Sequence, residues 1–324
     1  MGLTLVLGLS GHDPALAAPE AAKAVAAKPP EVQLGAWLSA SLGPRAFVPR
    51  VPGGAELLDL HGAAGLERAF EARGFRLADV RGGRRAVPRL YVTHMPRDLS
   101  GLRDVKARKA LFLRALLPIV LMANEEIHVL RRRTAALVRR EAGGDPLWGS
   151  ERVWLAALSE RYGVSDGDRV ELLRRLDGAP VSLALAQSIQ ESGWGSSRFA
   201  RKGNALFGQR TWKNAIPGLV PERREEGKAH RVRAFADLMA AARSYMHNLN
   251  THPAYEDFRR LRARLRASGE HAQGKRLAAT LLRYAEEGPG YVKALHIIMR
   301  TNALHAFDRA RLSSGILARA GLSS

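Results

Sequence analysis

The sequence predicts a mostly α protein with one small β-hairpin lobe. Apolar residues recur at helical spacing along most of the chain, and strand-like alternation is confined to a few short runs. The chain has 324 residues, 46% of them apolar, which is enough for one large core or for one core with a small extra domain. It contains no cysteine, so disulfides, thiolate chemistry and cysteine-based metal sites are excluded.

One stretch, 181–208, concentrates the unusual features of the chain. Apolar and small residues at 181, 184, 185, 188 and 189 predict a buried helix, and Pro180 suits its first turn. This helix is expected to end on a single acid, Glu191, directly before the Gly193-Trp194-Gly195 sequence. Burial and the carbonyl end of a helix both raise a carboxyl pKa, and a raised pKa suits a general acid near neutral pH.

The other elements follow from residue spacing. Helices are expected over 64–73, 103–140 (interrupted at Pro118), 151–162, 168–176, 238–249, 255–267, 274–283 and 290–302. Strands are expected over 76–80, 89–93, 206–212 and 231–235, and the last two form the β-hairpin lobe. A short turn is expected over 197–202, and Ser165 or Asp166 is expected to cap the helix that starts at 168.

Composition divides the chain into five predicted segments. Residues 1–18 have an apolar run and an A-x-A-like sequence, which indicates a signal peptide, although no basic residues precede the run. Residues 19–33 are rich in Ala, Pro and Lys and are typical of a linker. Residues 34–93 form a small α/β extension, 94–305 the main domain and 306–324 a C-terminal tail. The body of the chain contains no apolar run long enough to span a membrane.

The formal net charge is +20, which favours binding to polyanions such as nucleic acid, anionic lipid or an anionic cell-wall polymer. No nucleic-acid-binding module is recognisable, so no nucleic-acid partner is predicted. The glycines follow no nucleotide-binding pattern, and no cofactor is expected. His247 and His252 are five residues apart without a third ligand, so no metal site is predicted.

Four motifs resemble a known family. The sequences QESGWG at 190–195 and NALFG at 204–208 are similar to the signature of the glucosaminidase domain, glycoside hydrolase family 73. The sequence YMHNLNTHPAY at 245–255 resembles the Bax-like branch, and YAEEGPGYV at 284–292 resembles the closing tyrosine pair of the family. The resemblance covers about residues 88–305. It implies a lysozyme-like α+β scaffold, and an endo-β-N-acetylglucosaminidase that cleaves peptidoglycan glycan strands with Glu191 as general acid.

The resemblance also bears on the residues around the acid. It implies that Tyr245 lies near Glu191, where its hydroxyl donates to a charged intermediate. Tyr284 and Tyr291 are either core aromatics or walls of the cleft, and the resemblance favours Tyr284 as a wall. Trp194 and Phe207 are candidates for stacking on sugar rings. Two roles stay open for Phe207, since it could instead pack the hairpin against the helix. Asn204 either positions an acetamido group or caps a turn.

The second catalytic group is the open question. Glu222, Glu225 and Glu226 lie in a charged loop where some relatives carry an acid, but the Bax-like branch does not carry one dependably. The N-acetyl oxygen of the substrate is an alternative nucleophile. A lytic transglycosylase with one acid, or a non-catalytic glycan-binding protein on the same fold, are further alternatives. A wall substrate implies export, so the predicted location is the periplasm or cell envelope.

Overall fold

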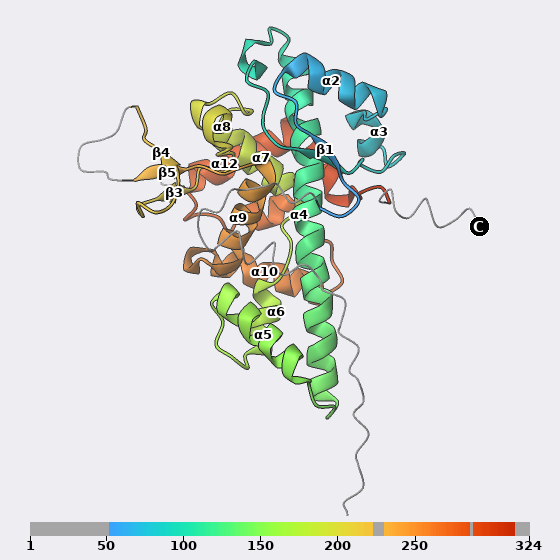
Figure 1. Cartoon of the computed structure of the whole chain (residues 1–324), viewed down its shortest axis with the longest axis vertical. Coiled ribbons are helices and arrows are strands. Elements are labelled where there is room, and N and C mark those ends of the chain that lie inside the picture. The colour runs from blue at the N-terminus through green and yellow to red at the C-terminus, as the bar shows by residue number, and fades with distance from the viewer. Residues whose placement is uncertain (1–51, 223–229, 286–287, 315–324) are drawn as a thin grey trace, which may run out of the picture. The chain divides into compact units, whose positions relative to one another are not determined.

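The computed structural model describes residues 52–222, 230–285 and 288–314. In these residues the chain is mostly helical, with two small sheets, which confirms the predicted fold class (Figure 1). The predicted signal peptide, the linker, Glu225 and Glu226 lie outside the described residues. Within the described residues, no helix combines the length and apolar composition needed to cross a bilayer.

The elements follow one another in a simple order. The α-helices are α2 (Ala63–Ala72), α3 (Leu77–Arg81), α4 (Val105–Ala142), α5 (Gly149–Tyr162), α6 (Arg169–Arg175), α7 (Val181–Ser192), α8 (Arg198–Gly203), α9 (Leu238–Thr251), α10 (Glu256–Ala267), α11 (Gly274–Ala278) and α12 (Pro289–Thr301). The 3-10 helices are η1 (Leu99–Gly101), η2 (Pro253–Tyr255) and η3 (Leu304–Arg309). The strands are β1 (Glu56–Leu58), β2 (Leu90–Val92), β3 (Arg210–Thr211), β4 (Gly218–Leu219) and β5 (Arg231–Arg233).

The two sheets differ in direction. Strands β1 and β2 pair in parallel, with Glu56 opposite Leu90 and Leu58 opposite Val92. The second sheet is antiparallel in the order β3-β5-β4, and Val232 of β5 lies opposite both Arg210 and Leu219. The predicted β-lobe is therefore present, but its strands are shorter than expected and a third strand completes it.

The structure corrects the strand predicted over 76–80, because these residues form the helix α3. The buried residues of this segment are Leu77 and Val80, which are three apart, and that spacing places both on one face of a helix. Residues 197–202 are also helical rather than a simple turn. Ser197 caps α8 by accepting a hydrogen bond from the Ala200 amide at 3.1 Å.

Two further expectations about helix ends and breaks were wrong. Pro118 does not interrupt α4, which runs through it for 38 residues. All residues from Leu111 to Asn124 are buried, so core packing outweighs the cost of a proline, about 3 kcal/mol. The cap of α6 is Asp168, whose carboxylate accepts a hydrogen bond from the Glu171 amide at 2.9 Å, rather than Ser165 or Asp166.

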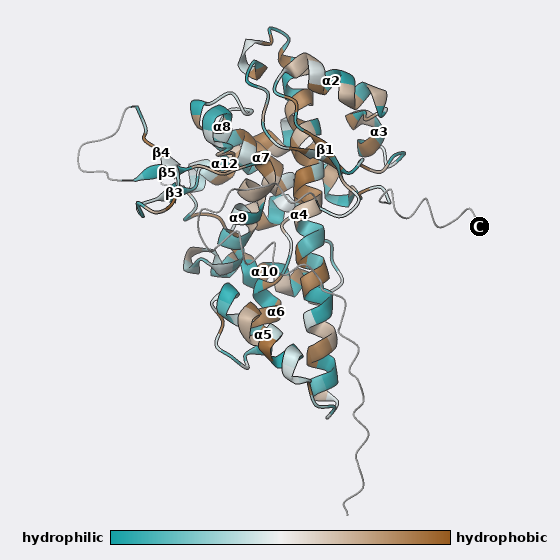
Figure 2. Ribbon diagram, viewed as in Figure 1, coloured by the Kyte–Doolittle hydropathy of each residue, from teal (hydrophilic) through white to brown (hydrophobic). Residues whose placement is uncertain are grey.

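The core forms where α4 packs against α7 and α9. Every residue of α7 from Val181 to Ile189 is buried, including its polar residues. Figure 2 shows hydrophobic residues gathered along α7 and the adjacent part of α4. Helix α7 also contacts α11, α12 and η3, so elements from distant parts of the sequence surround it.

Asp177 lies directly before α7 in a buried polar cluster. Its carboxylate accepts hydrogen bonds from Arg266 at 2.5 and 2.6 Å, and the Nε atom of Arg262 lies 3.9 Å away. Its carbonyl oxygen accepts from Asn250 on α9 and from Arg262 on α10. Burial alone would raise the pKa of Asp177, but His128, whose Nε2 lies 3.7 Å from the carboxylate, and the charges of both arginines hold this pKa far below its usual range. The cluster fixes the start of α7 to α4, α9 and α10.

A second carboxylate, that of Asp308, caps the first turn of α7. It accepts hydrogen bonds from the Ser182 amide and the Ser182 hydroxyl, both at 2.8 Å. Asp308 belongs to η3, and Val87 bridges Leu312 further along the chain. Residues 306–314, expected to begin a tail, are instead part of the packed structure. The rest of the predicted tail lies outside the described residues.

We predict that Asp177→Asn lowers the free energy of unfolding by about 3 kcal/mol, because it leaves Arg262 charged and buried without its partner. Because the folded-state pKa of Asp177 is depressed, its stabilisation is present above the unfolded pKa of about 3.9 and is lost as the pH falls below it. Urea denaturation at pH 7 and pH 3 measures both effects. Asp145→Asn, in the exposed loop after α4, is the matched control. Equal stability of the two variants at pH 7 would contradict this account.

Candidate active site

Helix α7 ends one residue after Glu191, in a tight left-handed turn. Gly193, Trp194 and Gly195 all have positive φ, at 56°, 61° and 73°. This conformation is unfavourable for a residue with a side chain, so Trp194 is held there by its surroundings. A Cβ atom on Gly195 would lie 3.0 Å from the Phe112 ring. The turn therefore needs a glycine at 195, both for its φ and for its close approach to α4.

The NALFG motif at 204–208 passes directly beside Glu191. Gly208 has a φ of 61°, and a Cβ atom there would lie 3.0 Å from Cδ of Glu191 and still closer to its Oε2 atom. The half-buried carboxylate of Glu191 thus occupies the space that a side chain at 208 would need. This contact explains physically why the two motifs occur together: the second leaves room for the acid of the first.

A chain of hydrogen bonds connects Glu191 to the core. The Tyr245 hydroxyl donates to Oε1 of Gln187 at 2.7 Å, and Nε2 of Gln187 donates to the Tyr291 hydroxyl at 3.0 Å. The Tyr291 hydroxyl in turn bonds to the Glu191 side chain. Gln187 lies one helical turn before Glu191 on α7, so both project from the same face.

The tyrosines near the acid remain protonated. Burial, and then the negative charge of Glu191, raise the pKa of Tyr291 far above its ordinary value. Burial, and then the neighbouring Tyr291 and Glu191, raise the pKa of Tyr284 in the same way. Burial is also the main cause of the raised pKa of Tyr245. These phenols therefore act as hydrogen-bond donors, not as acids or bases, across the physiological pH range.

The predicted substrate-binding aromatics divide into packed and more accessible residues. Phe207 is fully buried and stacks on Tyr245, with ring centroids 4.1 Å apart. Its carbonyl accepts a hydrogen bond from the half-buried Tyr284 at 2.9 Å. Trp194 is half-buried, and its ring meets Phe112 edge-on at 5.8 Å while the Lys109 ammonium lies 4.8 Å above it.

Asn204 is buried at the end of α8 in the left-handed conformation. Its side-chain Nδ2 donates to the carbonyls of Phe235 and Ala236 at 3.1 and 3.2 Å. These contacts connect the end of α8 to the segment between β5 and α9.

Glu222, the described member of the three loop glutamates, is exposed and pairs with Nε of Arg198 at 2.9 Å. Three hollows in the described surface are lined by residues of α10 and of the segment after α11, of α4 and α10, and of α3 and α12. Glu191 lines none of these three hollows.

The two histidines of the 245–255 motif have separate environments. Burial, and then the charges of Arg161 and Arg233, lower the pKa of His247 to about 4, so it is neutral near pH 7. Its ring packs edge-on against Tyr162 at 5.4 Å. His252 ends α9, and its Nδ1 accepts a hydrogen bond from the Ala254 amide at 3.2 Å.

The sequence analysis did not identify Gln187 as a residue of the site. The periodicity of α7 shows it only as one more buried helix residue. The sequence analysis also left Tyr291 undecided between core and cleft. The available signal was the position of Gln187 four residues before Glu191, which puts an amide on the face of the acid.

Comparison with known proteins agrees with these motifs. The glucosaminidase family, described as mannosyl-glycoprotein endo-beta-N-acetylglucosaminidase, matches residues 168–304. Protein bax of Escherichia coli K12 is 30% identical over 212 residues, which cover 63% of this chain and 73% of that protein. Peptidoglycan hydrolase FlgJ of Escherichia coli K12 is 29% identical over 122 residues, which cover 34% of this chain and 36% of that protein.

This chain thus spans only about a third of the length of FlgJ but most of the length of protein bax. No solved structure matches it significantly. The matched region contains α7, the β-lobe and all four motifs, and the similarity to protein bax extends well beyond it. The chain therefore belongs to the Bax-like proteins that carry a glucosaminidase domain.

Proposed function

We propose that the protein is a peptidoglycan hydrolase that cleaves glycan strands as an endo-β-N-acetylglucosaminidase. Membership of the glucosaminidase family supports glycoside hydrolysis, and the FlgJ relative is by name a peptidoglycan hydrolase. The observation that carries the proposal is the contact between Glu191 and Gly208, which joins the two family motifs around one carboxyl group. The net charge of +20 suits an anionic wall, and such a substrate puts the protein in the cell envelope.

In this proposal Glu191 protonates the departing glycosidic oxygen. Glycoside hydrolysis needs such an acid because the leaving alkoxide is a poor leaving group without a proton. Tyr291 holds the carboxyl group by a hydrogen bond and remains protonated, so it also stabilises the carboxylate left after proton transfer. Tyr245 acts one step further away, as a positioning residue that orients Gln187.

The substrate supplies the second catalytic group in this proposal, through its N-acetyl oxygen. The pairing of Glu222 with Arg198 favours this arrangement, because it engages the described loop carboxylate in an exposed ion pair. Trp194 and Tyr284, both half-buried, are the proposed sugar-contacting aromatics. Phe207 and Asn204 support the site from behind through their packing and hydrogen bonds.

We predict that Glu191→Gln keeps the fold and lowers the rate of lysis of purified cell wall by about a hundredfold or more, because the nearly isosteric amide cannot donate the required proton. Turbidity loss of wall suspensions measures the rate, and circular dichroism checks folding.

Glu222→Gln is the control for this experiment, since it removes a carboxylate of the exposed loop ion pair. It should retain most activity, as should Glu225→Gln and Glu226→Gln. Undiminished lysis by folded Glu191→Gln would refute the assignment of the acid. A severe loss in one of the loop variants would instead identify a second catalytic carboxylate. Wall binding without lysis by the unmodified protein would indicate a non-catalytic glycan-binding protein.

We predict that Gly208→Ala lowers wall lysis at least tenfold, because its new methyl group displaces the Glu191 carboxylate. The substitution also introduces backbone strain of about 1–2 kcal/mol at a positive φ. Gly163→Ala separates the two effects. Gly163 ends α5 with a similar φ of 62°, and the nearest atom to its Cβ position is the end of a flexible arginine at 3.4 Å. Both variants should lose stability, and only Gly208→Ala should lose activity. Equal activity of the two would contradict the proposed contact.

A further inference from the structure

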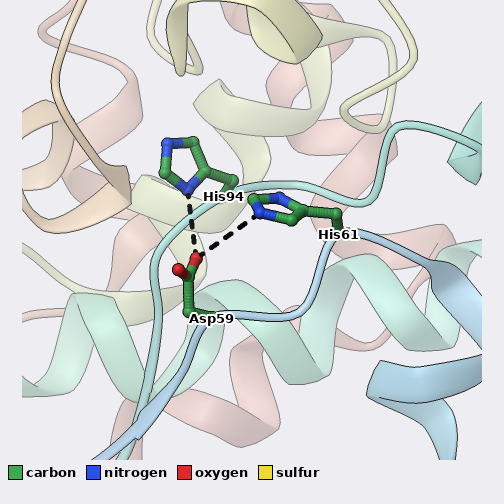
Figure 3. A group of neighbouring side chains, drawn as sticks. All are labelled: Asp59, His61 and His94. Atoms are coloured by element: carbon green, nitrogen blue, oxygen red, sulfur yellow. Dashed lines mark ion pairs between the residues drawn. The ribbon is translucent and has the colours of Figure 1, made fainter.

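A compact group of metal-ligating side chains lies in the two loops that follow the parallel strands. Asp59 and His61 come directly after β1, and His94 comes directly after β2. Because parallel strands end at the same edge of a sheet, residues 33 positions apart in the sequence meet there (Figure 3). In Figure 3 the two imidazole rings and the carboxylate point toward one another.

The spacing of the three groups is close to that of a metal site. Oδ1 of Asp59 lies 3.8 Å from Nδ1 of His94 and 4.0 Å from Nε2 of His61. One ligand atom from each of the three residues lies within 4.8 Å of the other two. Tetrahedral ligands at about 2.0–2.1 Å from zinc are about 3.4 Å apart. Binding of an ion would require the side chains of Asp59, His61 and His94 to rotate and close this difference.

The loops that carry the three residues are fixed before any ion binds. The Thr93 hydroxyl donates to Oδ1 of Asp59 at 2.6 Å, and the Arg97 amide donates to the His61 carbonyl at 3.0 Å. Asp98 accepts from the Ala63 amide at 2.8 Å. The contact from Thr93 is the kind of outer hydrogen bond that orients a ligating carboxylate in known metal sites.

The ring of His94 turns an unpaired nitrogen toward this group (Figure 3). Its Nδ1 atom is buried and has no hydrogen-bond partner among the described residues, although the side chain as a whole is 40% exposed. The Asp59 oxygen at 3.8 Å is too far away for a hydrogen bond. Buried polar atoms without a partner are uncommon in folded proteins, and a bound metal ion would satisfy this one.

We propose that Asp59, His61 and His94 bind a Zn²⁺ ion. Two imidazole nitrogens and one carboxylate oxygen, with a fourth position open to water, form a typical zinc ligand set. Magnesium and calcium prefer all-oxygen sites, so the two histidines favour a transition metal. The proposal does not depend on the function of Glu191.

The ion would connect the loop after β1 to the segment that leads from β2 to α4. Leu99 lies in this segment, and its Cδ2 atom would be 3.2 Å from a Cβ on Gly195. The segment therefore packs directly behind the turn that follows Glu191. Zinc would hold the segment between β2 and α4 in place through three side chains, in addition to the existing hydrogen bonds.

The test uses the untagged full-length protein, stripped with a chelator and titrated with ZnCl₂ by isothermal calorimetry. We expect one ion per chain, and an affinity that is at least about tenfold lower in His61→Gln, in His94→Gln and in Asp59→Asn. Thr93→Val, which keeps the shape but removes the hydroxyl bonded to Asp59, should weaken binding by a smaller factor. The control is the double variant His271→Gln/His296→Gln, whose two histidines bond to backbone carbonyls instead.

Two further readouts separate ligation from folding. Co²⁺ should give the visible absorption of a tetrahedral site in the unmodified protein and in the control, but not in His61→Gln/His94→Gln. Zinc should also raise the melting temperature of the unmodified protein and leave that of the same double variant unchanged. The proposal is overturned if the protein binds no zinc stoichiometrically, or if His61→Gln/His94→Gln binds it as tightly as the control does.

Discussion

The Glu191 carboxylate and the Cα atom of Gly208 occupy adjoining space, and the candidate site depends on this contact. It requires α7 to end next to the acid and the chain after α8 to pass beside it without a side chain. The left-handed turn at 193–195 lets α7 end next to the acid, and the buried Asn204 holds the chain after α8 in position. A helix from the core and the loop that leads into β3 thus meet at a single carboxyl group.

The same helix is held firmly at its other end. Asp177 joins the residues before α7 to α4, α9 and α10, and Asp308 caps the first turn. Buried charges of this kind are costly unless they are fully paired, so they specify one position for the helix more than they add stability. Near the acid, neutral groups hold the other end of α7, through the hydrogen bonds from Tyr245 to Gln187 and from Gln187 to Tyr291.

Local patterns predicted α7 almost to its last residue, and the short motifs identified the family before any contact was known. The failures were of two kinds. At 76–80 the short segment was compatible with a strand and with a helix, and at Pro118 core packing outweighed a local preference. Gln187, and the grouping of Asp59 and His61 with His94, were missed because their meaning depends on contacts between distant segments. Loops after parallel strands are where such contacts concentrate.

The central claim is that this site hydrolyses the glycan strand, and the chemistry of the new chain ends tests it most directly. Purified peptidoglycan, digested with the protein and analysed by mass spectrometry, should gain reducing N-acetylglucosamine ends. Reducing N-acetylmuramic acid ends would indicate a muramidase, and anhydro-N-acetylmuramic acid ends would indicate a lytic transglycosylase. No new ends under conditions in which the folded protein binds the wall would contradict the account.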